Sequence, residues 1–85
     1  MQEIKFEHVR ILRKMVIHQR IGAAHILVDN LVRVVPKDRR GAANDAIEDL
    51  IRWGILAAKS TKHGKAISIV PESLDRVREI LGVSP

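Results

Sequence analysis

The spacing of apolar residues along the chain predicts an α+β fold that is mainly helical. In the first segment Phe6, Val9 and Leu12 recur at three-residue steps, and charged residues lie between them. This is the pattern of an amphipathic helix. Three later segments have similar helical spacing. The four helices are therefore expected near residues 6–19, 23–35, 38–53 and 72–81.

The second and third helices are marked differently in the sequence. Several β-branched residues lower the helix propensity of residues 23–35, and the run from Ile26 to Val28 could instead pair as a strand. The third helix has clearer limits. Asp38 can accept hydrogen bonds from its first amides, and Gly54 can adopt the left-handed conformation that ends a helix.

Gly41 lies in the first turn of the third helix, where glycine lowers helix propensity by about 1 kcal/mol relative to alanine. Two explanations are open. Either another backbone, such as a phosphate chain, approaches the first amides of the helix closely, or the helix packs tightly against the second helix.

After the third helix the apolar period changes to two, which indicates β-strands. Strands are expected near residues 55–60 and 65–70, joined by a short connection in which Gly64 supplies the positive φ of a tight turn. In the second strand Ile67 and Ile69 alternate with smaller residues. One face of this hairpin is therefore expected on the helices and the other in water.

Composition places the chain in one small domain and points to a class of partner. Its 85 residues favour a single core over residues 1–85, and the absence of cysteine excludes disulfides and thiolate metal sites. The formal net charge of +5 at pH 7 favours a polyanionic partner such as nucleic acid. The only aromatic residues are Phe6 and Trp53, which argues against stacking platforms for single-stranded nucleic acid.

The sequence also bears on location. No apolar run approaches the roughly 18 residues that span a bilayer, and the N-terminal residues lack the basic-then-apolar order of a signal peptide. We therefore expect a cytoplasmic protein, associated with the nucleoid.

The predicted order over residues 6 to 81 is helix, helix, turn, helix, hairpin, helix. The third helix ends in a W-G-I-L junction, where Gly54, Ile55 and Leu56 lead into the first strand. This pattern resembles the winged helix-turn-helix family, chiefly small archaeal and bacterial transcription regulators. The resemblance implies that the third helix enters the DNA major groove with its N-terminal half, and that the hairpin, or wing, touches the DNA backbone or minor groove. The other residues that carry the resemblance are Ala43, Ala46, Ile47, Leu50, Lys59, Gly64, Ile67 and Ile69.

The resemblance assigns DNA contacts to two parts of the chain. Arg39, Arg40 and Asn44 lie in the first half of the third helix, and their side chains match guanine and adenine edges, so we expect them to read bases. The segment from Arg52 to Pro71 has four basic residues and no acidic one, which suits it to neutralising phosphates. The residues expected to hold the DNA backbone are Lys37, Lys59, Lys62, His63 and Lys65.

Other interpretations of these charges stay open. The arginines could pair with Asp38 and Asp45 nearby, and the hairpin lysines could simply be solvated. Asp45, Glu48 and Asp49 also place negative charge on the presumed reading helix. Three functions follow: sequence-specific binding of double-stranded DNA by a small transcription regulator, which we favour; binding of structured RNA in a ribonucleoprotein; and interaction with another protein.

We expect no enzyme, no cofactor and no metal. The sequence has no nucleophile motif and no glycine-rich phosphate loop, and its four histidines are not spaced as a metal site. The apolar surfaces of the valine-rich second helix and of the terminal helices exceed the needs of one small core. The family resemblance implies a homodimer joined through the first and fourth helices.

Overall fold

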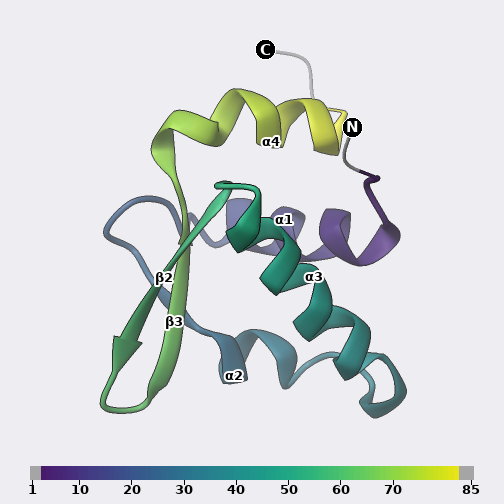
Figure 1. The fold of residues 1–85 in the computed structure, drawn as a ribbon, viewed down its shortest axis with the longest axis vertical. Coiled ribbons are helices and arrows are strands. Elements are labelled where there is room, and N and C mark those ends of the chain that lie inside the picture. The colour runs from purple at the N-terminus through teal and green to yellow at the C-terminus, as the bar shows by residue number, and fades with distance from the viewer. Residues whose placement is uncertain (1–2, 83–85) are drawn as a thin grey trace.

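The computed structural model describes residues 3–82, and residues 1–2 and 83–85 of the expected domain lie outside this range. The described chain is a small α+β fold with four α-helices and a three-stranded antiparallel sheet (Figure 1), so the expected fold class is confirmed. The elements are α1 (Phe6–Ile17), β1 (Ile26–Leu27), α2 (Val28–Val32), α3 (Arg40–Arg52), β2 (Leu56–Thr61), β3 (Gly64–Ile69) and α4 (Leu74–Leu81), with 3-10 turns at Lys37–Arg39 and Pro71–Ser73.

The hairpin is present within one residue of its predicted limits. Strands β2 and β3 pair antiparallel from Leu56 opposite Ile69 to Thr61 opposite Gly64, which leaves a two-residue connection. The sheet also has a third strand, because β1 pairs with the other edge of β3. The hairpin is thereby joined to the body of the protein at Ala66 and Ile67 of its inner strand.

The prediction of one long helix over residues 23–35 is wrong. Ile26 and Leu27 form strand β1, with Ile26 opposite Ile67, and the helix that follows has only five residues. The reason is the β-branched run, which loses little side-chain entropy in an extended strand and gains backbone hydrogen bonds along β3. The strand alternative is the one that the structure adopts.

The remaining helices keep their predicted places with shifted ends. The first ends at Ile17, two residues early, because Gln19 adopts a left-handed conformation with φ 55°. A 3-10 turn precedes both α3 and α4. Asp38 does not cap α3, since it lies inside the first of these turns and its side chain makes no capping hydrogen bond there. Gly54 is left-handed at φ 78°, as predicted.

The prediction that one face of the hairpin lies on the helices and the other in water is wrong for β3. Ala66 and Ser68, which alternate with Ile67 and Ile69, are buried as well. Strand β3 is the central strand, so β1 and β2 cover both of its edges, and its small outward side chains have little area left to expose.

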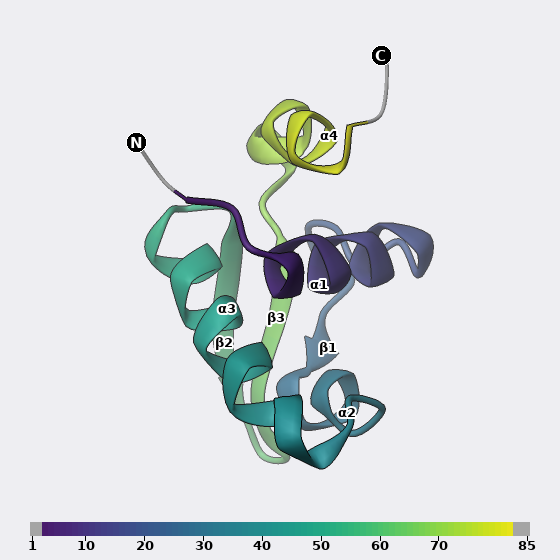
Figure 2. The same ribbon diagram turned by 90° about the vertical axis from the view of Figure 1, so that its right-hand side faces the viewer.

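The core joins the sheet to four helices, because α2 contributes Leu31 and Val32. Helix α1 packs against α3 and also against α4, and the largest fully buried side chains come from α1, α3, β3 and α4. This frame holds the hairpin turn, α2 and the start of α3 at one end of the molecule, with α4 at the opposite end (Figures 1 and 2). None of the described helices is long and apolar enough to cross a membrane. The central core residues are Leu12, Met15, Ile47, Leu50, Ile67, Ile69 and Val77.

Candidate nucleic-acid interface

The tip of the hairpin is an ordered turn. Gly64 has φ 120°, a conformation that side chains rarely adopt. The hydroxyl of Thr61 donates a hydrogen bond of 2.6 Å to the carbonyl oxygen of Gly64 and accepts one of 3.2 Å from the backbone amide of His63. These bonds fix the connection and leave the side chains of Lys62 and His63 exposed to solvent.

The three lysines of the hairpin differ in what they touch. Lys59 on β2 and Lys62 at the tip are exposed, and neither forms an ion pair with any residue in 3–82. The ammonium group of Lys65 instead lies 2.6 Å from Oε2 of Glu48 on α3. Two hairpin lysines are therefore available to a polyanion, and the third ties the hairpin to α3.

The two arginines at the start of α3 are engaged with the protein itself. The guanidinium of Arg39 lies 3.1 Å from Oε1 of Glu7 and over the ring of Phe6, at 5.5 Å. Arg40 donates from Nε to the carbonyl oxygen of Val35 and from a terminal nitrogen to that of Arg33, both at 3.0 Å. The pairs with acids of the same segment, which the sequence left open, are not the ones formed. Arg40 fastens the connection between α2 and α3.

The outward face of α3 is more acidic than a typical DNA-reading helix. Gly41, Asp45, Glu48 and Arg52 recur at helical spacing and are all exposed. Asn44 is also exposed and lies one turn before Glu48, on the side of α3 that meets the hairpin lysine. The exposed amide and acids of this face can contact base edges, because carboxylates accept from cytosine and amides pair with adenine.

The structure excludes one of the two explanations for Gly41. A Cβ atom built there meets no heavy atom within 4 Å, so tight packing against α2 is wrong. The first turn of α3 is open on this side. Lys37, in the preceding 3-10 turn, is likewise exposed.

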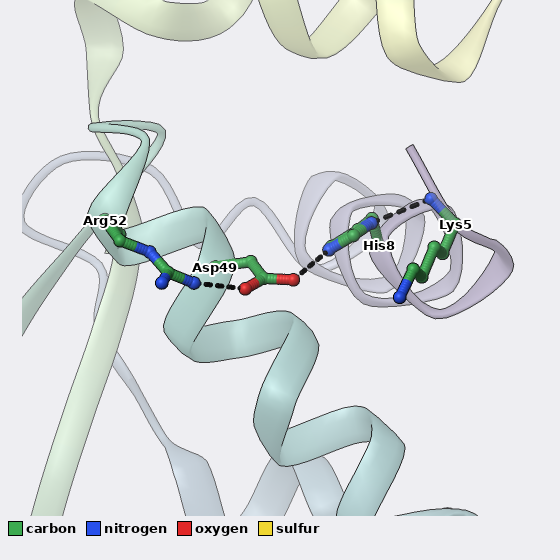
Figure 3. A network of polar contacts seen from close by, with 4 residues as sticks. All are labelled: Lys5, His8, Asp49 and Arg52. Carbon is green, nitrogen blue, oxygen red and sulfur yellow. Dashed lines mark hydrogen bonds and ion pairs between the residues drawn. The ribbon is translucent and has the colours of Figure 1, made fainter. Parts of the chain in front are cut away.

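A buried histidine joins the start of α1 to α3 (Figure 3). His8 is fully buried, and its Nδ1 accepts a hydrogen bond of 2.8 Å from the backbone amide of Lys5. Its Nε2 lies 2.9 Å from a carboxylate oxygen of Asp49, whose other oxygen accepts from Arg52. Because Nδ1 accepts, the proton sits on Nε2 and is donated to the carboxylate. Trp53 packs on the imidazole, with 4.8 Å between ring centroids.

This network turns Asp49 toward α1 and away from the outward face of α3. The hydrogen bond from His8, together with the positive charge of Arg52, lowers the pKa of Asp49 below its ordinary value. The sequence contained one weak signal for the network. His8 stands three residues after Lys5, where a capping box has Glu or Gln at the third helical position. Its partner on α3 is 41 residues away, which no local pattern shows.

No three or more His, Asp or Glu side chains come together as metal ligands within residues 3–82. The histidines lie apart: His8 is buried on α1, His63 is at the hairpin tip, and His25 bonds through Nδ1 to the backbone of Ala23. The candidate interface thus consists of exposed lysines, the side-chain amide of Asn44 and the first turn of α3.

No protein-family model, curated protein or solved structure matches this chain. Its function is therefore inferred from its own residues and their arrangement.

Proposed function

We propose that this protein binds double-stranded DNA as a winged helix-turn-helix domain, with the β2–β3 hairpin as the wing. The observation that carries the proposal is the pair of exposed, unpaired hairpin lysines, Lys59 and Lys62, on a hairpin fixed at the same end of the fold as the start of α3. The order of helices and hairpin supports it, because this order carries the resemblance to that family.

The wing supplies affinity in this proposal. Each lysine that neutralises a phosphate releases a condensed counterion, so binding weakens steeply as salt rises. Lys59, Lys62 and His63 need only give up water to do this, because their side chains are exposed. Lys37 adds a further exposed cation beside the first turn of α3.

Helix α3 supplies sequence preference. It approaches the major groove with its N-terminal end, where Gly41 leaves space for the DNA backbone and Asn44 is exposed. Arg39 reaches DNA only by leaving Glu7. Arg40 has a positioning role, since its guanidinium holds the α2–α3 connection. As a transcription regulator the protein would use Asn44 as the main base-reading side chain.

Salt-dependent titration tests the proposal. A labelled 20-base-pair DNA duplex and an RNA duplex of matching sequence are titrated with the protein, and fluorescence anisotropy is followed at several salt concentrations. The variant Lys59→Gln/Lys62→Gln is expected to reduce the log–log salt slope by about 1.8, or 0.9 per lost phosphate contact. Arg78→Gln, which removes one charge from α4 at the other end of the fold, is the control. An unchanged slope in the double variant would mean that the wing does not contact the DNA. Tighter binding of the RNA duplex would mean that RNA, and not DNA, is the target.

Protein binding is the second candidate function. It is favoured by Asp45, whose exposed carboxylate on the outward face of α3 repels phosphate, whereas Glu48 on the same face is paired with Lys65. This candidate predicts no binding to either duplex, even at low salt.

A further inference from the structure

A second surface lies away from the hairpin, between α1 and α2. An open groove of about 290 Å³ lies there. In Figure 2, α1 lies above α2, and α3 and β2 lie to their left. The floor of the groove includes the buried side chains of Ile11 and Leu31. Two apolar residues at its edges, Ile17 and Val34, are 68% and 62% exposed. Apolar side chains this exposed around a groove mark a binding surface.

The rim of the groove is positively charged. Arg10, Arg13 and Lys14 project from α1 along it, and none forms an ion pair with another residue in the part of the chain that the structure describes. The one carboxylate in the lining, Glu7, is already neutralised by Arg39. The groove therefore offers apolar contacts beside uncompensated positive charge.

A second copy of this chain is a poor occupant. Contact between two such grooves places the cations of α1 against the same cations of the other copy, which is repulsive. The described residues also offer little to fill the groove, because the large exposed hydrophobic side chains among them are Phe6, Ile17 and Val34. The last two line the groove itself, and the ring of Phe6 already contacts the guanidinium groups of Arg10 and Arg39.

We infer that the groove binds an acidic amphipathic helix of another protein. Such a helix lays apolar side chains at positions i, i+3 or i+4, and i+7 into a groove between two helices. Its flanking carboxylates then meet Arg10, Arg13 and Lys14. A flat anionic membrane fits less well, because the apolar floor at Ile11 and Leu31 is buried below the rim. Duplex nucleic acid presents only small apolar groups such as the thymine methyl, which do not reach the floor of the groove.

The cations of this surface are distinct from those of the wing. They are on α1, whereas the unpaired lysines of the wing are on the hairpin. A bound partner would therefore leave Lys59 and Lys62 accessible. This inference does not depend on the proposed function, and the two fail independently.

Two labelled helical peptides of roughly 16 residues test the inference. Both carry leucine at helical spacing on one face, and the flanking positions are glutamate in one and lysine in the other. Anisotropy should show binding of the glutamate peptide and at least about tenfold weaker binding of the lysine peptide. Chemical-shift changes in ¹H–¹⁵N spectra should lie on α1 and α2.

Matched variants locate the contact. Arg13→Glu is expected to lower the affinity for the glutamate peptide by about tenfold. Lys62→Glu, with the same change in net charge, should lower that affinity by less than about twofold. DNA binding should show the reverse order. Ile17→Gln and Val34→Gln should also lower the affinity for the peptide, and both side chains are exposed enough for the fold to tolerate the change.

Several results overturn the inference. These are no binding of the glutamate peptide, equal binding of both peptides, equal effects of Arg13→Glu and Lys62→Glu, or shift changes on the hairpin. A homodimer that Ile17→Gln dissociates in sedimentation shows a second copy in the groove. Retention of the protein on phosphatidylglycerol vesicles, lost in the same variants, shows a membrane surface instead.

Discussion

The hairpin and the start of α3 carry the same kind of residue and differ in what those residues touch. Lys59 and Lys62 are exposed and form no ion pair within residues 3–82. Arg39 is held by the carboxylate of Glu7, and Arg40 is held by two backbone carbonyl groups. A cation held by protein acceptors must release them before it binds phosphate, and leaving acceptors unpaired costs free energy. Basic residues of equal charge are therefore unequal as ligands.

The largest expected effect comes from Arg40. Arg40→Ala leaves the carbonyl groups of Val35 and Arg33 without their partner, so it should lower the free energy of unfolding by about 2 kcal/mol. Urea unfolding followed by circular dichroism measures this. Lys37→Ala, an exposed neighbour, should change stability by less than about 0.5 kcal/mol. A variant that keeps its stability and loses DNA binding would make Arg40 a DNA ligand after all.

The hairpin should show the opposite behaviour. Lys59→Gln/Lys62→Gln should leave the urea midpoint unchanged, because neither side chain contacts the protein through an ion pair. DNA affinity near 0.1 M salt should fall by at least about tenfold, which corresponds to about 1.4 kcal/mol. Parallel anisotropy and unfolding measurements check both parts. Loss of stability in this variant would erase the distinction between the two regions.

A smaller effect is expected at Gly41. Gly41→Ala should raise the free energy of unfolding by about 0.5 to 1 kcal/mol, because the added methyl group meets no heavy atom within 4 Å and alanine favours helix. The same variant should weaken DNA binding if a phosphate backbone docks beside the first turn. Higher stability with unchanged affinity would place the DNA elsewhere on α3.

The smallest effect concerns pH. The pKa of Asp49 is lowered in the folded state, chiefly by the hydrogen bond from His8, so its carboxylate stabilises the fold above its ordinary pKa. This stabilisation is lost as the pH falls from that value through the lower pKa of the folded state. Unfolding between about pH 5 and pH 3 should therefore depend more steeply on pH in the wild type than in Asp49→Asn. Equal slopes would mean that the carboxylate charge contributes nothing.

The local pattern predicted what depends on neighbours in the sequence. Helix α3, the hairpin and Gly54 follow from apolar spacing and turn residues that lie side by side in the chain. The sequence supports strand β1 only as an alternative to a helix, because two residues carry little periodicity and their partner Ile67 is about forty positions away.

The sequence predicted the type of candidate site but not the individual contacts of its side chains. The sequence pointed to a basic hairpin, and the structure places Lys59, Lys62 and His63 on its exposed surface. The sequence alone could not show that Arg40 binds carbonyl groups, because this contact depends on how the chain turns between α2 and α3. The contact between His8 and Asp49 was missed for the same reason, since it forms only when α1 and α3 pack together.

The position of β2 at the edge of the sheet has a consequence for solubility. Its outer side presents amide and carbonyl groups that no strand of residues 3–82 covers, next to the small exposed side chains of Ala57 and Ala58. Such an edge is a template for strand addition by a second molecule, and lysines on it oppose that aggregation. Lys59 on this strand thus also acts as a gatekeeper, and a hydrophobic replacement at this position would favour edge-to-edge assembly.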